Sequence, residues 1–135
     1  MSDGPAKPAA APDPTCRALG IELLELRPGF ARLQMRIGDD MANAHGTGHG
    51  GIVFLLADAA SGYATNADDN TDAVIVAHGA TITYLAPAPL GGWLTATASE
   101  SHRAGRTAIY DVTVTDEAGD TVAVLRTTGL STRRR

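Results

Sequence analysis

The chain has 135 residues, of which 44% are hydrophobic and 19% charged, which is typical of one globular domain. Its formal net charge of −4 disfavours a general nucleic-acid-binding protein, which would present a basic face. Cys16 is the single cysteine, so no internal disulfide can form, and no apolar run reaches the roughly 20 residues that span a bilayer. With no signal-peptide pattern at the N-terminus, we expect a cytoplasmic protein.

The first 14 residues are rich in alanine and proline and carry almost no large apolar side chain, so residues 1–14 are predicted to form a disordered tail. Residues 15–132 are predicted to form a single domain. Two strands at 21–27 and 30–37 open it as a hairpin, because apolar and polar residues alternate along the second one. Residues 38–49 are polar and glycine-rich and predict a loop.

From Gly50 to about Asn66 the sequence carries one charge, Asp58, and is otherwise apolar or small. This stretch is long for a strand, and a helix that is apolar on nearly all sides is one buried in a core. The remainder alternates in the manner of four strands, at 73–87, 91–105, 106–116 and 121–131. This order predicts an α+β fold in which a long antiparallel sheet wraps around one central helix.

The run AHGTGHGG at 44–51 permits several interpretations. A dinucleotide-binding turn needs its glycines between a strand and a helix within repeating βαβ units, and a P-loop needs a lysine where Ile52 stands. A metal site needs a third ligand beside His45 and His49, for instance His78 or His102, and the intervening glycines disfavour a helical pair. We therefore expect no metal ion and no redox cofactor.

The start of the helix offers a third interpretation. The first amides of a helix are unsatisfied and favour negative charge, and Gly50 and Gly51 would let another molecule approach that backbone closely. They would suit the developing oxyanion of an ester or thioester, or they would merely allow tight helix–strand packing. Asp58 is likewise either a paired structural carboxylate or a general base or nucleophile.

The two candidate groups on this helix cannot meet within one chain. Eight residues at about 1.5 Å of rise put Asp58 roughly 12 Å along the axis from Gly50. If both act on one carbon, they must come from different subunits. The functional interpretation therefore predicts a symmetric homodimer with two composite sites.

Asn43, then His49-Gly50-Gly51, then LAD ending at Asp58, resembles the hotdog-fold acyl-CoA thioesterases, closest to the phenylacetic-acid-degradation (PaaI-type) branch and its 4-hydroxybenzoyl-CoA thioesterase relatives. The resemblance covers roughly residues 16–130. It implies a sheet wrapped around one long helix, subunits paired into dimers and usually tetramers, and hydrolysis of an acyl-CoA thioester without metal or redox cofactor.

The resemblance also implies roles for individual residues. Gly50 would offer its backbone amide to the thioester carbonyl, and His49 would orient the loop or contact the substrate near that carbonyl. Asn43 would position the carbonyl or the attacking water. Asp58 of the neighbouring subunit would act as nucleophile or as general base for water.

Binding residues follow from the same resemblance. Arg103, Arg106 and Thr107 are the candidates for holding the anionic phosphates of coenzyme A, although the sequence HRAGRT also fits a solvated hairpin end. Gly51 would lie against the substrate beside Gly50.

Ser61 and Gly62, one helical turn beyond Asp58, would leave room for the acyl group. Relatives of the 4-hydroxybenzoyl branch carry a larger polar residue where this chain has Gly62, so the implied substrate is phenylacetyl-CoA or another aryl or medium-chain acyl-CoA. Two alternatives stay open: a non-catalytic protein that binds acyl-CoA or another small ligand, and a hydratase-like enzyme of the same fold. Hotdog hydratases pair the aspartate with a downstream histidine, and residues 59–66 contain none.

Overall fold

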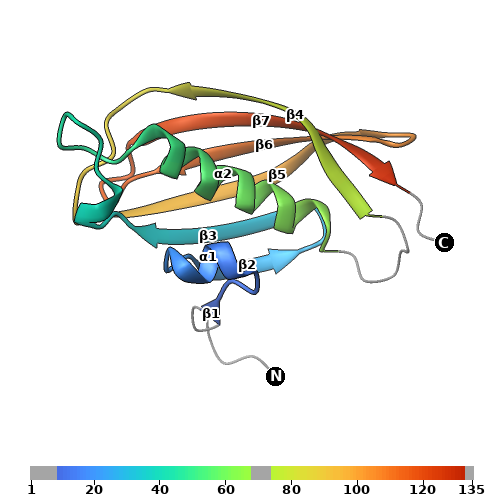
Figure 1. Cartoon of the computed structure of the whole chain (residues 1–135). Helices are drawn as coiled ribbons and strands as arrows, with labels where there is room; N and C mark the ends of the chain where they lie inside the picture. Colours follow the sequence, from blue (N-terminus) through green and yellow to red (C-terminus); the bar gives the residue numbers. More distant parts are fainter. Residues whose placement is uncertain (1–8, 68–73, 133–135) are drawn as a thin grey trace.

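The computed structural model describes residues 9–67 and 74–132, which form one antiparallel sheet curved around a long helix (Figure 1). The helix is α2 (Gly50–Thr65), and α1 (Pro14–Ala18) and the 3-10 turn η1 (Asp39–Met41) are short. The strand order is β1-β2-β3-β5-β6-β7-β4. The strands are β1 (Ala9–Ala10), β2 (Glu22–Arg27), β3 (Phe30–Arg36), β4 (Val74–Tyr84), β5 (Trp93–Ala104), β6 (Thr107–Thr115) and β7 (Thr121–Thr132). This architecture confirms the predicted α+β fold.

Alternation along the strands places one face of the sheet in the core. Every second residue of β3, of β6 and of the first half of β5 is almost fully buried, and the set comprises Ala31, Leu33, Met35, Leu94, Ala96, Ala98, Ala108, Tyr110, Val112 and Val114. Alanine at several of these positions leaves the inner face shallow, so that α2 can pack closely on it.

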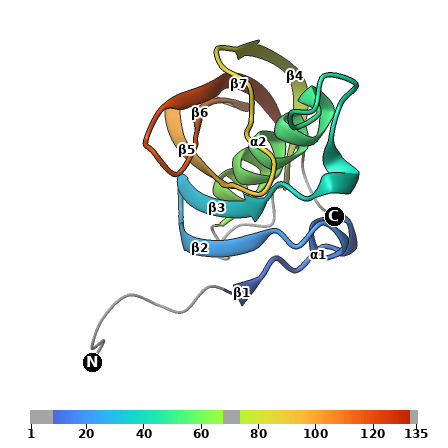
Figure 2. The same cartoon turned by 90° about the vertical axis from the view of Figure 1, so that its left-hand side faces the viewer.

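The helix α2 lies against this inner face through one side. Its buried apolar residues are Val53, Leu56, Ala57, Ala60 and Ala64, whereas Gly51 and Gly62 on the other side are exposed. The sequence predicted a helix buried on nearly all sides; within one chain the side that faces the curved sheet is buried, and most of the other side is partly buried (Figure 2). None of the helices in the two described ranges is long and apolar enough to cross a membrane.

The N-terminal segment departs from the predicted tail. Residues 1–8 lie outside the described residues, but Ala9 and Ala10 pair with β2 and Ala11 is 0% exposed. The Asp13 side chain accepts a hydrogen bond of 2.7 Å from the Cys16 amide and thereby caps α1. Backbone pairing with the edge of β2 needs no large side chains, which is why composition alone missed this segment.

The remaining predicted elements correspond to observed ones. The hairpin of β2 and β3, the loop before α2 and the four strands after it all occur, with ends shifted by a few residues. Residues 68–73, between the predicted helix and the strand that follows it, lie outside the described residues.

Candidate active site

The loop before α2 is organised by the side chain of Asn43. Its Oδ1 accepts hydrogen bonds from the amides of His45 (2.9 Å) and Thr47 (3.1 Å), and its Nδ2 donates to Thr47 Oγ1 at 3.0 Å. Asn43 is therefore engaged in shaping the loop that leads to the helix. A direct contact of Asn43 with substrate stays a prediction.

The first two amides of α2 differ in whether they have a hydrogen-bond acceptor among the described residues. His49 is the N-cap: its Nδ1 accepts from the Gly51 amide at 3.0 Å, and its carbonyl oxygen accepts from the amides of Ile52 and Val53. Within the described parts of the chain, the amide of Gly50 has no hydrogen-bond acceptor. Gly50 thus presents a free donor at the positive end of the helix dipole, while the Gly51 amide, predicted to meet substrate, is already bound by His49.

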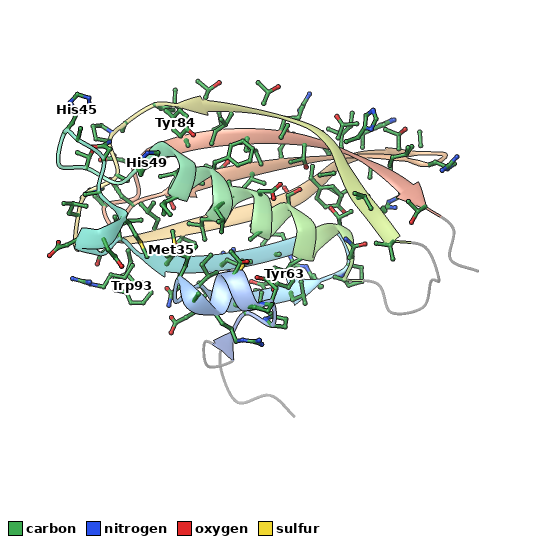
Figure 3. The ribbon with its side chains drawn as sticks, in the orientation of Figure 1. Met35, His45, His49, Tyr63, Tyr84 and Trp93 are labelled. Atoms are coloured by element: carbon green, nitrogen blue, oxygen red, sulfur yellow. The ribbon has the colours of Figure 1, made fainter. Side chains whose placement is uncertain are left out.

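Tyr84 lies against Gly50, and sequence reasoning missed it. The Tyr84 hydroxyl donates to the Gly50 carbonyl oxygen at 2.8 Å, and Figure 3 shows its side chain beside His49 at the start of α2. Tyr84, Gly50 and Asn43 contribute to a pocket of about 360 Å³ together with Val53, Leu85 and Val122. Tyr84 ends a strand distant in sequence, so no local motif could have linked it to the helix.

Asp58 lies further along α2 in a second pocket. Its side chain is half-buried, and no described residue donates a hydrogen bond to it. Burial raises the pKa of its carboxyl above the ordinary aspartate value, because desolvation disfavours the charged form. The pocket measures about 410 Å³ and is lined by Asp13, Leu26, Asp58, Ala59, Gly62, Tyr63 and Asn66.

Of the two predicted acyl-pocket residues, the structure brings one to Asp58. Gly62 lies in the Asp58 pocket and, having no side chain, leaves it open. Ser61 does not: it is buried, and its hydroxyl bonds to Thr127 Oγ1 on the inner face of the sheet at 2.5 Å. Within the chain Ser61 does not line the Asp58 pocket, because the rotation of α2 on the sheet turns its side chain inward, and its contact with the acyl group stays a prediction.

The predicted phosphate-binding residues gather at the hairpin between β5 and β6. That hairpin lies at one end of the folded molecule, and α2 begins at the other end (Figure 1). Arg103 donates to Glu100 Oε1 at 2.7 Å, Arg106 donates twice to the carbonyl oxygen of Ser131, and Thr107 begins β6. Both guanidinium groups are exposed to solvent but already donate hydrogen bonds within the chain. A phosphate of coenzyme A would either replace these hydrogen bonds or bind beside them.

Metal and thiol chemistry find no support in the described ranges. No group of three His, Cys, Asp or Glu side chains there could hold a metal ion. Burial raises the pKa of the Cys16 thiol to about 12, which keeps it protonated at neutral pH. The absence of a metal from the reaction stays a prediction.

Comparison with known proteins bears on this site. The chain matches the family described as the Thioesterase superfamily over residues 45–123, a stretch that includes Gly50 and Asp58. Acyl-coenzyme A thioesterase PaaI of Escherichia coli strain K12 is 38% identical over 114 residues, which cover 84% of this chain and 79% of the relative.

Solved structures resemble it over similar lengths. The E. coli PaaI protein from the phenylacetic acid degradation operon gives a TM-score of 0.84 at 36% identity, covering 90% of this chain and 86% of that one. A Streptococcus mutans UA159 protein bound to acetyl CoA gives a TM-score of 0.78 at 28% identity, covering 85% and 90%.

Proposed function

This chain belongs to the thioesterase superfamily of hotdog-fold acyl-CoA thioesterases, and from that premise we propose that it hydrolyses an acyl-CoA to the free acid and coenzyme A. The carbonyl carbon loses its bond to sulfur and gains one to oxygen, and water supplies the oxygen and the thiol proton. One observation carries the proposal: α2 presents at Gly50 an amide that has no acceptor among the described residues, together with a half-buried carboxylate at Asp58.

The Gly50 amide would stabilise the negative charge that develops on the thioester oxygen. His49 supports the same step. Because its Nδ1 accepts from Gly51, the ring carries a proton on Nε2, which has no partner among the described residues and could donate to the substrate carbonyl. Asp58 would attack the thioester carbon or remove a proton from the attacking water. Water is the only co-reactant, so chelating agents should leave the rate unchanged.

The two roles of Asp58 can be separated. A nucleophilic Asp58 forms an anhydride with the acyl group and expels the coenzyme A thiol; where water then attacks the aspartyl carbon, one product oxygen comes from the carboxylate and Asp58 gains a water oxygen. A general base leaves the carboxylate unlabelled, and so does attack of water on the acyl carbon of the anhydride. A single turnover in ¹⁸O-water followed by mass spectrometry of the protein therefore identifies a nucleophile when label enters Asp58, and a rapid-quench search for acylated protein identifies the anhydride in the other case.

We place each active site between two subunits. Gly50 and Asp58 lie about 12 Å apart along α2, too far to act on one carbon within a chain. A second copy could cover two surfaces: the partly exposed side of α2, and the edge strand β4 with the residue that follows it, where Val76 is 53% and Leu85 57% exposed. A homodimer is the smallest assembly that completes the site, and further pairing into a homotetramer stays a prediction.

The Asp58 pocket would hold the acyl group. Most polar groups that line this pocket already have hydrogen-bond partners within the chain, which favours an apolar acyl group. The Tyr63 hydroxyl donates to Asp13, the Asp13 carboxylate also accepts from Cys16, and the Asn66 amide is bonded to the backbone. An acyl group in this pocket would therefore contact the ring of Tyr63, the aliphatic side chain of Leu26 and the carboxylate of Asp58. Phenylacetyl and medium-chain acyl groups fit this environment, since neither brings a polar group that needs a partner.

Coenzyme A would bind with its phosphates near Arg103, Arg106 and Thr107. The hairpin between β5 and β6 that carries them lies at the opposite end of the molecule from the start of α2 (Figure 1), which is a further reason to place the ligand across subunits. Each guanidinium keeps exposed donors for a phosphate.

The first experiment measures free-thiol release from a panel of acyl-CoAs, phenylacetyl-CoA included, by the wild type and Asp58→Asn. We expect rapid release by the wild type and a loss of at least about 100-fold in the variant, the size expected for removing a general base or nucleophile. Little release across the panel with tight retention of coenzyme A would favour a binding protein.

A further inference from the structure

The peptide group between Gly50 and Gly51 is held from both sides. Its carbonyl oxygen accepts from the Tyr84 hydroxyl at 2.8 Å, and its N–H donates to His49 Nδ1 at 3.0 Å. His49 comes from the helix cap, whereas Tyr84 comes from the end of β4 (Figure 3). One peptide at the start of α2 is thus fixed to the sheet and to the preceding loop.

The position needs such fixing. Two successive glycines have more backbone freedom than any other pair, and the first turn of a helix is where helices fray. The Tyr84 ring also rests on this backbone: a Cβ built on Gly50 would lie 3.1–3.4 Å from three of its atoms. Contact and hydrogen bond together limit the motion of Gly50.

Tyr84 is itself anchored by its strand. It is paired with Ala123 of β7, and the next amide, that of Leu85, donates to the Val122 carbonyl oxygen at 2.8 Å. The hydroxyl therefore reaches Gly50 from a hydrogen-bonded sheet. A connection of this kind holds a catalytic backbone group in place before substrate arrives.

We propose that Tyr84 is a positioning residue: its hydroxyl and His49 together fix the Gly50–Gly51 peptide, so that the neighbouring Gly50 amide is aimed at the thioester oxygen. This inference rests on the proposed function, since it assumes that Gly50 is the oxyanion donor. It assigns Tyr84 to the geometry of the step and not to substrate binding.

Tyr84→Phe tests it, because the ring and its contact with Gly50 remain while the hydroxyl is lost. We expect kcat for phenylacetyl-CoA, or for the best substrate of the panel, to fall about three- to tenfold, the effect of one lost hydrogen bond, with KM unchanged. Thr113→Val, which removes a hydroxyl from the outer face of β6, is the matched control and should keep wild-type rates.

Amide hydrogen exchange gives a second measurement that does not depend on turnover. In Tyr84→Phe, a peptide covering residues 48–56 should exchange faster than in the wild type, while a peptide from β6 should be unchanged. The double variant with His49→Ala should lose less kcat than the product of the single losses, because both side chains hold one peptide.

The outcomes separate this inference from the proposed function. Wild-type kcat and unchanged exchange in Tyr84→Phe would overturn the positioning role while leaving the thioesterase intact. A raised KM with unchanged kcat would overturn it as well, since the hydroxyl would then bind substrate. No turnover by the wild type would refute the proposed function, and the exchange comparison would still show whether Tyr84 holds the start of α2.

Discussion

Asp58 carries a carboxylate that the fold desolvates without offering it a hydrogen bond from any described residue. Its raised pKa means that the folded state favours the protonated form. The stabilising effect of a bound proton is fully present below the unfolded pKa of about 3.9 and is lost as pH rises through the higher folded pKa. Ionisation of Asp58 as the pH rises therefore destabilises the fold.

Asp58→Asn should accordingly be inactive but more stable. We expect Asp58→Asn to have a higher melting temperature than the wild type at pH 7. The difference should shrink as the pH falls toward 4, because the Asp58 carboxyl of the wild type then becomes protonated and is as neutral as the asparagine amide. Thermal denaturation at several pH values measures this. An unchanged melting temperature at pH 7 would mean that the carboxylate has a stabilising partner in the assembled protein.

The same shift predicts the pH dependence of catalysis. A carboxylate acts as base or nucleophile only when ionised, so kcat/KM should fall on the acid side through the raised pKa of Asp58. The midpoint of that limb should lie above the ordinary aspartate range. A pH–rate profile of the wild type tests it, and a flat profile from pH 4 to 8 would contradict the role of Asp58.

Gly50 can be tested by removing only its amide hydrogen. Proline is favoured at the first position of a helix and lacks the N–H, so Gly50→Pro should keep α2 while kcat falls by about 100- to 1,000-fold. Gly50→Ala is the control, because it adds a similar Cβ near Tyr84 but keeps the donor. Equal losses in the two variants would point to crowding against Tyr84 instead of a lost donor.

Single residues also mark where sequence reasoning ends. Gly50 and Asp58 could be singled out because glycine and an isolated charge stand out against an apolar helix. Ser61 could not be separated from Gly62 without the rotation of α2 on the sheet, which tertiary packing sets. Tyr84 reaches Gly50 across 34 positions of sequence, so no spacing rule could have found it.

At the level of elements, α1 depends on a cap from the segment expected to be disordered. Asp13→Ala should cost about 1 kcal/mol of unfolding free energy, because the carboxylate caps the helix and holds the Tyr63 hydroxyl. Asp13→Asn, which can still cap, should lose less. Urea denaturation of both variants measures the difference, and wild-type stability of Asp13→Ala would show that the cap is dispensable.

The elements themselves were largely predictable, for a physical reason. Strands with one buried face must alternate, and the stretch from Gly50 to Asn66, which is apolar or small except for Asp58, is too long for one strand and therefore predicts the helix. The pairing of Ala9 and Ala10 with β2 carries no such signal, since it uses backbone groups alone. The order of strands in the sheet could not be predicted from the sequence either. The strands β3 and β5 are neighbours in the sheet, although α2 and β4 lie between them in the chain.

For the whole molecule, one chain leaves the proposed reaction incomplete. The free amide of Gly50 and the carboxylate of Asp58 lie in separate pockets, and the hairpin with Arg103 and Arg106 lies at the far end. A twofold arrangement of two chains can bring Gly50 of one copy to Asp58 of the other, and does so twice. Activity should therefore depend on pairing.

An experiment with mixed subunits tests whether activity depends on pairing. We expect a chain carrying Gly50→Pro and a chain carrying Asp58→Asn each to be inactive when paired with itself, whereas their hybrid would contain one intact Gly50–Asp58 pair. If subunits exchange at random in an equal mixture, half of the dimers are hybrids with one working site of two, so about a quarter of wild-type activity should return.

A chain with both substitutions gives the opposite result when paired with wild type, and this contrast excludes simple refolding effects. In composite sites each pair then contains one altered residue, so the hybrid is inactive and activity per wild-type chain falls. Sites contained within single chains would behave in reverse: the hybrid of single variants would stay inactive, and the hybrid with wild type would keep half of its activity. Mass spectrometry of the intact assemblies must confirm that hybrids form, because only then does the activity of the two mixtures report where the two halves of the site reside.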